Sequence, residues 1–475
     1  MINKYLAVIV LIAIAYLLTA CNESSEQKNP LNPEEPTTVV VWHYYNGNIK
    51  NKFDTLITEF NETVGMEKGI VVDAQSQGDV NQLATAVYES ANATIGAAPM
   101  PDIFAAYPDN AIRVHEVSEL VPLDTYFTIE ELQEFRQEFL EEGRFLSDER
   151  LYIMPVAKSS ESLYVNKTYW DKFALDNGFE QEDLKTWEKL TDVAKSYYEK
   201  TGQGFFGIDS NANYILLAGM QLGTEIFTYT EDNDVKFNLD KTVARKIWDY
   251  FYVPYIQGYF VKTGRFSSDD AKTGTVLAYT GSTAGATYFP SEVTFSQNHV
   301  ESIEPLIMPY PYFQEGQAYA TQQGAGMCMT KSNDTHEYAA AEFLRWFTNT
   351  QQNIRFAIST GYIPVKEEAL NEELMIKTMQ EEAINNPTIE ASIRSTVKMF
   401  EAYRFYNNKP FEGSYEIRLL LESHLSNKVL RDLERMKSEG LKGQAREERI
   451  KELVSEEAFL QWYQQLVEEA DRILE

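Results

Sequence analysis

Along the first quarter of the chain, short apolar runs typical of strands alternate with segments in which apolar residues recur at helical spacing. Residues 37–42 (TTVVVW) form a β-branched run, and a second such run lies at residues 70–74. Between these runs, apolar side chains recur every three to four residues, which predicts an amphipathic helix. The pattern then repeats, with a helix that Asp79 caps and a third strand at residues 101–106. The sequence therefore predicts a β-α-β-α-β unit of parallel strands with right-handed crossovers.

The loops after these three strands form the edge where a ligand is expected. In an open parallel sheet, ligands bind beyond the carboxyl ends of the strands. In this chain those ends lead into the loops at residues 43–48, 75–78 and 107–110. Aromatic and amide side chains are common in these loops, which favours a polar, neutral ligand.

A second unit of alternating strands and helices begins near Ala157 and runs to about Tyr279. Further short strands are predicted at residues 276–281, 304–308 and 325–329, each marked by a short apolar run.

The last third of the chain has mostly helical periodicity. Asp334 followed by Glu337 resembles a capping box, and apolar residues up to Phe347 then mark the inner face of a helix. Beyond residue 365 the pattern is almost wholly helical, and one helix carries the stripe Leu421, Leu425, Val429 and Leu433.

The first 21 residues have the layout of a secretory signal that ends in a lipobox. Lys4 precedes an uncharged stretch that is too short to span a bilayer comfortably. The tetrapeptide Leu18-Thr19-Ala20-Cys21 is the motif in which the cysteine is acylated and everything before it is removed. We expect a signal peptide at residues 1–20, a lipid on Cys21 and a flexible tether at residues 21–36. A signal peptide with an accidental cysteine, or a true membrane anchor, stays open as an alternative.

Composition narrows the class of partner. Without residues 1–20 the chain has 41 Lys and Arg residues against 72 Asp and Glu residues, a formal net charge of −31. Such a charge argues against a nucleic-acid partner and favours neutral or cationic ligands. The remaining 455 residues exceed the size at which one core keeps growing, so at least two domains are expected. The chain has two cysteines, and with Cys21 acylated Cys328 has no partner for a disulfide, so we expect it to be a small buried hydrophobe.

Six motifs occur in a fixed order between residues 37 and 450. They are VVVWHYY, PVAKSSESLYVNK, KTWEKL, AYTGSTAG, GAGMCMTKSNDTHEYAAAEFLRWF and TGYIPV. In this order and behind a lipobox, they resemble the family 1 extracellular solute-binding proteins of ABC importers, which include maltose-type and glycerol-phosphate-type binding lipoproteins.

The resemblance implies an α/β fold of the periplasmic-binding-protein type II, with two lobes, a hinge, an interlobe cleft and a helical C-terminal region. The chain would cross the hinge near Ala157, Gly281 and Phe347, and the lobes would close on a ligand in the cleft. The implied N-lobe comprises residues 37–157 plus 282–347. The implied C-lobe, which is rich in helices, comprises residues 158–281 plus 348–475.

Candidate ligand contacts follow from the strand ends and from the resemblance. Aromatic faces after the first strand can stack on a sugar ring, although Trp42 and one tyrosine could instead belong to the core. Asp102 could instead cap a turn after Pro101. The candidates from the first three strand ends are Trp42, Tyr44, Tyr45, Gln77, Gly78, Asp102 and Tyr107.

The remaining candidates lie on the implied crossovers and in the distal segment. A carboxylate at Glu161 suits sugar hydroxyls, although Lys158 could instead pair with it as a hinge salt bridge. Small residues on the returning strands permit close backbone approach, and Arg404 would bind an anionic head group. These candidates are Lys158, Ser159, Glu161, Ser282, Thr283, Gln323, Gly324, Tyr362 and Arg404.

Enzyme signals are weak. The pattern Gly202-Gln-Gly204-Phe-Phe-Gly207 follows a predicted helix and precedes a strand, the reverse of a dinucleotide turn. The histidines show no metal-ligand spacing, so neither a metal nor a cofactor is expected. Glu161 and Asp102 are the one conceivable glycosidase pair.

The sequence therefore predicts a lipid-anchored, monomeric substrate-binding subunit of an ABC importer on the outer face of the cell membrane. It would capture a mono- or oligosaccharide and deliver it to the membrane permease, without catalysis. A glycerol-phosphate-like anion, bound by Arg404, Lys158 and the Ser282 region, is the second hypothesis. An extracellular carbohydrate-active enzyme and an adhesin or structural lipoprotein are the alternatives from other classes.

Overall fold

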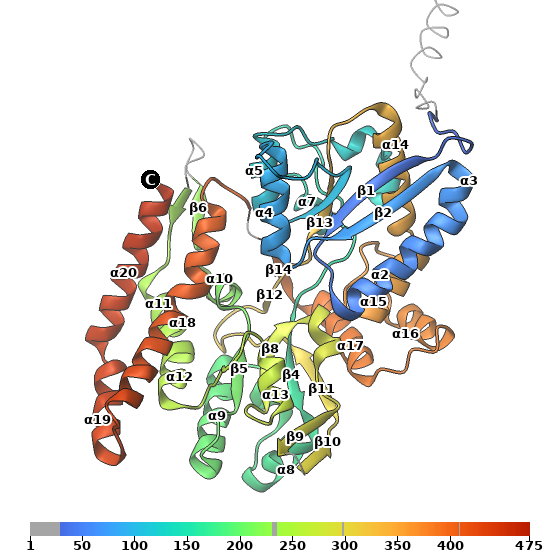
Figure 1. Ribbon diagram of the computed structural model, residues 1–475. Helices are drawn as coiled ribbons and strands as arrows, with labels where there is room; N and C mark the ends of the chain where they lie inside the picture. The colour runs from blue at the N-terminus through green and yellow to red at the C-terminus, as the bar shows by residue number, and fades with distance from the viewer. Residues whose placement is uncertain (1–28, 230–234, 297–298, 408) are drawn as a thin grey trace, which may run out of the picture.

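Two four-stranded β-sheets organise the protein into two α/β lobes (Figure 1). The computed structural model describes residues 29–229, 235–296, 299–407 and 409–475. The predicted signal peptide, Cys21 and the first part of the tether lie outside these residues. Within the described ranges, no helix combines the length and the apolar character needed to cross a membrane. The expected two-lobed α/β architecture is confirmed.

The first sheet is the predicted β-α-β-α-β unit with one strand added. Its strands run in the order β13-β3-β1-β2, with β1 parallel to β2 and β3, and with β13 antiparallel to β3. Val39 and Val41 of β1 are fully buried because the sheet is covered by helices on both faces. The elements of this lobe are β1 (Thr37–His43), α2 (Gly47–Phe60), α3 (Met66–Lys68), β2 (Ile70–Ser76), α4 (Val80–Ala91), β3 (Ile103–Ala106), α5 (Pro108–His115), α6 (Ile129–Gln133), α7 (Gln137–Glu141), β13 (Gly326–Met329) and α14 (Asp334–Phe347).

Side-chain caps fix where two helices of this lobe begin. Asp79 caps α4 as predicted, because its carboxylate accepts hydrogen bonds from the backbone N–H groups of Asn81 and Gln82. The start of α14 differs from the prediction. Asn333, rather than Asp334, accepts from the first free N–H groups of that helix, since the Glu337 carboxylate turns back to the Ser332 N–H instead.

The second sheet has the order β11-β4-β8-β5, with β4 buried along its whole length. Its large aromatic core includes Trp170, Trp187 and Trp248. The elements of this lobe are β4 (Glu161–Asn166), α8 (Lys167–Asn177), α9 (Trp187–Thr201), β5 (Phe206–Ile208), α10 (Asn211–Gln221), β6 (Phe227–Tyr229), β7 (Val235–Phe237), α11 (Lys241–Ile247), α12 (Val253–Gln257), α13 (Ser267–Lys272), β8 (Ala278–Ser282), β9 (Glu292–Ser296), β10 (His299–Ser302) and β11 (Pro305–Pro309).

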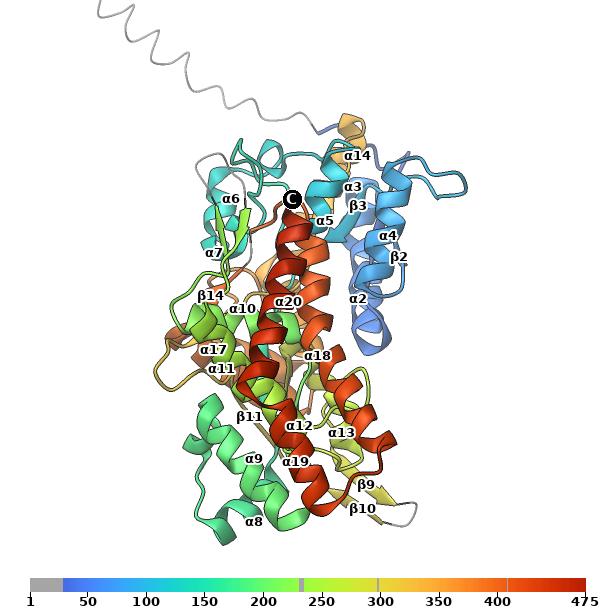
Figure 2. The ribbon, with the colours of Figure 1, turned by 90° about the vertical axis from the view of Figure 1, so that its left-hand side faces the viewer.

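The C-terminal part is helical, as expected, and its last three helices cover one side of the second lobe (Figures 1 and 2). The predicted stripe Leu421, Leu425 and Val429 is buried and faces α10, while Leu433 is only partly buried. The remaining elements are β12 (Tyr319–Thr321), α15 (Thr350–Thr360), α16 (Glu372–Glu381), α17 (Pro387–Ala402), β14 (Arg404–Tyr406), α18 (Ser414–Ser438), α19 (Gly443–Leu453) and α20 (Glu456–Leu474).

Long-range pairing differs from the expected lobe boundaries at several points. Strands β9, β10 and β11 fall within the expected N-lobe but lie in the second lobe, where β11 hydrogen-bonds to β4. Phe356 of α15, expected in the C-lobe, packs in the core of the first lobe. Leu31, expected in the tether, already packs against that core. In each case the partner is distant in sequence, and the local pattern does not specify it.

Candidate functional site

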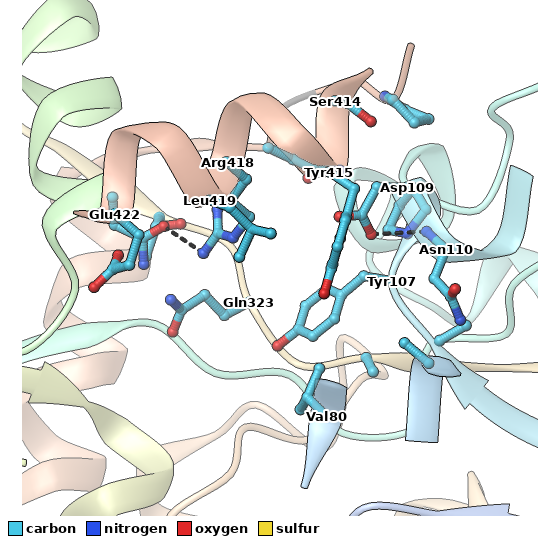
Figure 3. Close-up of a pocket in the computed structure, with 18 of the residues that line it drawn as sticks. Val80, Tyr107, Asp109, Asn110, Gln323, Ser414, Tyr415, Arg418, Leu419 and Glu422 are labelled. Atoms are coloured by element: carbon cyan, nitrogen blue, oxygen red, sulfur yellow. Dashed lines mark hydrogen bonds between the residues drawn. The ribbon is translucent and has the colours of Figure 1, made fainter. Parts of the chain in front are cut away.

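A cavity of about 370 Å³ lies between the two lobes, within the usual range of about 300–1,000 Å³ for small-molecule sites. One wall comes from the first lobe: the carboxyl ends of β1 and β3 and the first turns of α4 and α5. The opposite wall comes from α10, α18 and the segment after β14. We call these the strand-end wall and the helical wall. In Figure 3, α18 crosses one side of the cavity and Tyr107 and Asn110 approach from the other.

The strand-end wall presents two tyrosines that follow the central strands. Tyr44 comes directly after β1, and its hydroxyl is 3.3 Å from that of Tyr362. Tyr107 comes directly after β3, and its hydroxyl accepts a hydrogen bond of 3.3 Å from the Gly324 N–H. Burial raises the pKa of both phenols. Both side chains therefore stay neutral and offer aromatic faces together with hydroxyl groups.

The helical wall is positioned by the amphipathic face of α18. Ile417 and Leu421 are buried in the core of the second lobe, so Arg418 and Glu422, each one residue further along, lie beside that core at the cavity (Figure 3). The Arg418 guanidinium donates to the side-chain oxygen of Asn213 at 3.1 Å. The Glu422 carboxylate accepts from the Ala212 N–H at 2.9 Å, which satisfies a free N–H in the first turn of α10.

The cavity has few charges and many neutral polar groups. Its three charged lining residues are Asp109, Arg418 and Glu422. Burial raises the pKa of Asp109, and the positive charge of Arg418 opposes that rise. The aromatic and amide lining residues are Tyr44, Tyr107, Phe227, Tyr406, Tyr415, Asn81, Asn110, Asn213, Asn407, Gln322 and Gln323.

Two contacts span the lobes beside the cavity. The Arg113 guanidinium of α5 lies 4.5 Å from the ring centroid of Tyr88 and 5.4 Å from that of Tyr415, which belongs to α18. The Arg265 guanidinium of the second lobe lies 3.4 Å from the Asp79 carboxylate, the cap of α4. Both contacts hold the strand-end wall against elements of the second lobe.

Three of the predicted site residues line the cavity: Tyr44, Tyr107 and Gln323. The other predicted residues lie elsewhere or one layer behind the lining. These are Trp42, Tyr45, Gln77, Gly78, Asp102, Lys158, Ser159, Glu161, Ser282, Thr283, Gly324, Tyr362 and Arg404.

The neighbours of Tyr44 on the first strand are core residues. Trp42 is 4% exposed and donates its indole N–H to the Gln75 side chain at 3.1 Å. Tyr45 is 1% exposed and packs in the first core. In the next loop, Gln77 donates its backbone N–H to the His43 carbonyl at 2.9 Å, and Gly78 has a φ of +95°.

Asp102 lies at the amino end of β3, away from the cavity. Its carboxylate accepts from the Val40 N–H at 2.8 Å and lies 2.9 Å from the His336 ring nitrogen. The cavity is at the opposite, carboxyl end of the same strand, beside Tyr107. Asp102 and Glu161 are therefore not arranged across the cavity as a glycosidase pair would be.

The crossover that contains Lys158 is buried and internally paired. Lys158 forms an ion pair with Glu142, not with Glu161, and donates to the Gly324 carbonyl at 2.9 Å. Gly324 has a φ of +93°, and a β-carbon there would lie 2.4 Å from the Ala157 carbonyl oxygen. The close crossing of these two segments therefore requires glycine at this position.

The other crossover candidates serve the same packing. Ser159 exchanges backbone hydrogen bonds of 2.8 Å with Gln323. The Thr283 hydroxyl accepts from the Ser160 N–H at 3.2 Å, and Ser282 caps the 3₁₀ turn at residues 283–288. Tyr362 is 6% exposed and reaches the cavity only through the hydroxyl of Tyr44.

Arg404 lies outside the cavity lining. It is exposed on β14, with its guanidinium 3.4 Å from the Tyr319 hydroxyl. The lining instead contains Arg418, which the sequence reasoning missed together with Asp109, Asn213, Tyr415 and Glu422. The spacing of four between Arg418 and Glu422, beside the apolar stripe of α18, was the available signal that they share a face.

No metal centre is apparent in the described part of the chain. None of its His, Cys, Asp and Glu side chains form a group of three or more that could hold a metal ion. Cys328 is buried and free, and burial raises the pKa of its thiol.

Residues 55–387 match the family model described as bacterial extracellular solute-binding protein. A comparison with curated protein sequences gives no significant match.

The fold is similar to that of several solved binding proteins. The cyclic alpha-maltosyl-1,6-maltose binding protein from Arthrobacter globiformis is 16% identical, with a TM-score of 0.65 over 92% of this chain and 99% of that one. UgpB from Mycobacterium tuberculosis, solved with glycerophosphocholine, is 17% identical, with a TM-score of 0.65 over 92% and 100%. Maltose-bound MalE3 of T. maritima is 15% identical, with a TM-score of 0.63 over 89% and 99%.

Proposed function

Because the chain belongs to the bacterial extracellular solute-binding proteins, we propose that it captures a carbohydrate between its lobes and delivers it to the permease of an ABC importer. A solute held between two lobes gains contacts that neither lobe supplies alone, so binding shifts the population toward the closed form. The permease then receives the closed, loaded form. Binding and release account for this role without a covalent step.

The lining of the interlobe cavity carries this proposal. Tyrosine faces from both lobes suit the C–H faces of sugar rings, and the amide side chains between them suit hydroxyl groups. The solved proteins of similar fold include ones bound to maltose and maltotriose, which supports the same class of ligand.

A glycerol-phosphate-like anion has less support at this cavity. Lys158 is already paired with Glu142, and Arg404 lies outside the lining. Among the described residues, Arg418 is the single positively charged one in the lining, and it shares the cavity with the carboxylates of Asp109 and Glu422. A phosphate would gain one ion pair and meet two negative groups.

Lipidation at Cys21 belongs to the same proposal. A diacylglycerol on that residue would hold the protein stably at the outer face of the membrane, where a permease could receive the ligand. Mass spectrometry of the mature protein tests this point, because it distinguishes a lipid-modified Cys21 from an unmodified or uncleaved N-terminus.

The decisive experiment is a ligand screen with the chain from Asn22 onward. A ligand that binds the folded state raises Tm by mass action. We expect a mono- or oligosaccharide to raise Tm, and chromatography to recover that sugar unchanged. A Tm rise with glycerol phosphate alone would overturn the carbohydrate assignment, and a consumed sugar would reveal an enzyme.

A further inference from the structure

Glu161 is a buried carboxyl one layer behind the helical wall. It is the first residue of β4 and is 2% exposed. One carboxylate oxygen, Oε1, accepts from the Asn213 side-chain amide at 2.8 Å, with the Gln323 amide nitrogen further off at 3.5 Å. Both amides belong to residues that line the cavity, whereas Glu161 does not. The carboxyl group thus accepts hydrogen bonds from two lining side chains without being part of the lining.

The Asn213 amide connects Glu161 to Arg418. Its NH₂ group donates to Glu161, and its carbonyl oxygen accepts from the Arg418 guanidinium at 3.1 Å. A carboxylate can only accept and a guanidinium can only donate, so just one orientation of the amide satisfies both neighbours. Asn213 is 3% exposed, and the packing of α10 leaves it little freedom to turn. The direction of the amide therefore helps to orient the Arg418 guanidinium.

We propose that Glu161 is a positioning residue for ligand binding, which sets the affinity through Asn213 and Arg418 without contacting the ligand. This inference rests on the proposed function of the cavity. It differs from the direct contact that the sequence predicts for Glu161, since the carboxyl group is screened from the cavity by Asn213 and Gln323.

The protonation state of Glu161 makes the connection from Glu161 through Asn213 to Arg418 measurable. Burial raises the pKa of Glu161 to about 7. Asp209 and Glu422 act in the same direction, whereas the Asn213 hydrogen bond and Arg418 oppose it. The nearby phenols of Tyr164 and Tyr310 stay neutral, because burial raises the pKa of each.

The second carboxylate oxygen, Oε2, is buried and accepts no hydrogen bond from any described residue. Since the pKa of this carboxyl group is raised to about 7, we expect it to change charge between pH 6 and pH 8. A hydrogen bond to a carboxylate is stronger than one to a neutral carboxyl group by about 1 kcal/mol. Protonation should loosen Asn213, and through it Arg418, so that affinity falls by about fivefold as the pH drops from 8 to 6.

Kd is measured by calorimetry at pH 6, 7 and 8. The ligand is the sugar that gives the largest Tm shift in the screen, and maltotriose is the first sugar tried. We expect wild type to lose about fivefold in affinity from pH 8 to pH 6. Glu161→Gln keeps an acceptor for Asn213 without a charge, so it should bind the sugar with a Kd that is flat over this range. In an Asn213→Ala background, Glu161→Gln should change neither Kd nor its pH dependence.

Two controls separate this inference from simpler causes. Glu67→Gln removes a charge from an exposed position on α3 and should leave the pH profile of wild type intact. Asp109→Asn removes a lining carboxyl group whose pKa is also raised by burial, and the pH dependence should persist in it. A pH dependence that survives in Glu161→Gln, or disappears in Asp109→Asn, overturns this inference but leaves the proposed function standing. If no sugar of the panel binds, the proposed function fails and this inference fails with it.

Discussion

The two walls of the cavity are built in different ways. The strand-end wall comes from the ends of strands and from the first turns of α4 and α5, and burial raises the pKa of its phenols, Tyr44 and Tyr107. The helical wall is brought from the far end of the chain by α18 and carries two of the three charged lining residues, Arg418 and Glu422. Both walls present aromatic side chains, but the helical wall adds a guanidinium and a carboxylate that are held in place by hydrogen bonds to α10. Substitutions in the two walls should therefore differ in size and in pH dependence.

The largest effect is expected at the buried crossover that contains Lys158. Lys158→Met leaves the Glu142 carboxylate buried without its cation, which should lower the free energy of unfolding by about 3–5 kcal/mol. Denaturant unfolding of the purified variant measures this loss. Lys50→Met, which breaks an exposed pair with Asp54, is the matched control and should cost about 0.2–1 kcal/mol. Equal losses in the two variants would show that burial of the crossover pair is unimportant.

A smaller, pH-dependent effect on stability is expected behind the helical wall. The folded protein binds a proton at Glu161 more tightly than the unfolded chain, because burial raises the pKa from 4.5 to about 7. This stabilisation is complete below pH 4.5 and is lost as the pH rises through 7. Glu161→Gln has no such loss, so its stability relative to wild type should be about 3 kcal/mol greater at pH 8 than at pH 4.5.

Denaturant unfolding at the two pH values checks this prediction and needs no ligand. A constant difference between the two proteins would mean that Glu161 does not titrate in this range.

The charged part of the helical wall should dominate binding. Arg418→Ala removes hydrogen bonds from a charged donor, worth about 1.5–3 kcal/mol, and should weaken sugar binding by about ten- to hundredfold. Arg404→Ala is the matched control, since that guanidinium is exposed and outside the lining. Calorimetry with the same sugar compares them, and a larger loss in Arg404→Ala would move the site away from this cavity.

The aromatic faces should make the smallest individual contributions. Tyr107→Leu keeps apolar bulk but removes the ring face, which is worth about 0.5–1.5 kcal/mol, so Kd should rise about two- to tenfold. Tyr415→Leu on the helical wall should act similarly. If Tyr107→Leu weakens binding and Tyr415→Leu does not, the sugar ring stacks on the strand-end wall only.

The strand-end wall could be predicted because the sequence reveals the strands that position it. The runs before Tyr44 and Tyr107 have strand periodicity, and helical patterns separate them, so chain order places both residues at one edge of a sheet. Gln323 could be placed for a related reason, since it directly precedes the predicted strand at residues 325–329. In these cases the local pattern that predicts a strand also predicts where the residue next to that strand lies.

The helical wall could not be predicted in the same way. The stripe of α18 shows which face is apolar, but the contact between Glu422 and Ala212 joins residues 210 positions apart. Nothing in the periodicity of either helix specifies that pairing. Strand β11 illustrates the same limit, because its sequence predicts a strand but not β4 as its partner. Local sequence gives no measure of which guanidinium faces the cavity, so it points to Arg404 and misses Arg418.

The placement of Arg113 between Tyr88 and Tyr415 has a kinetic consequence. Its contact with Tyr415 joins α5 of one lobe to α18 of the other, so it has to break before the lobes can separate. A contact of this kind slows the departure of a bound molecule more than it hastens arrival, because it forms only after the lobes have met. At about 0.5–1 kcal/mol, it would lengthen the residence time of the bound molecule by about two- to fivefold. The time for which the protein holds its cargo would thus depend partly on a side chain outside the cavity lining.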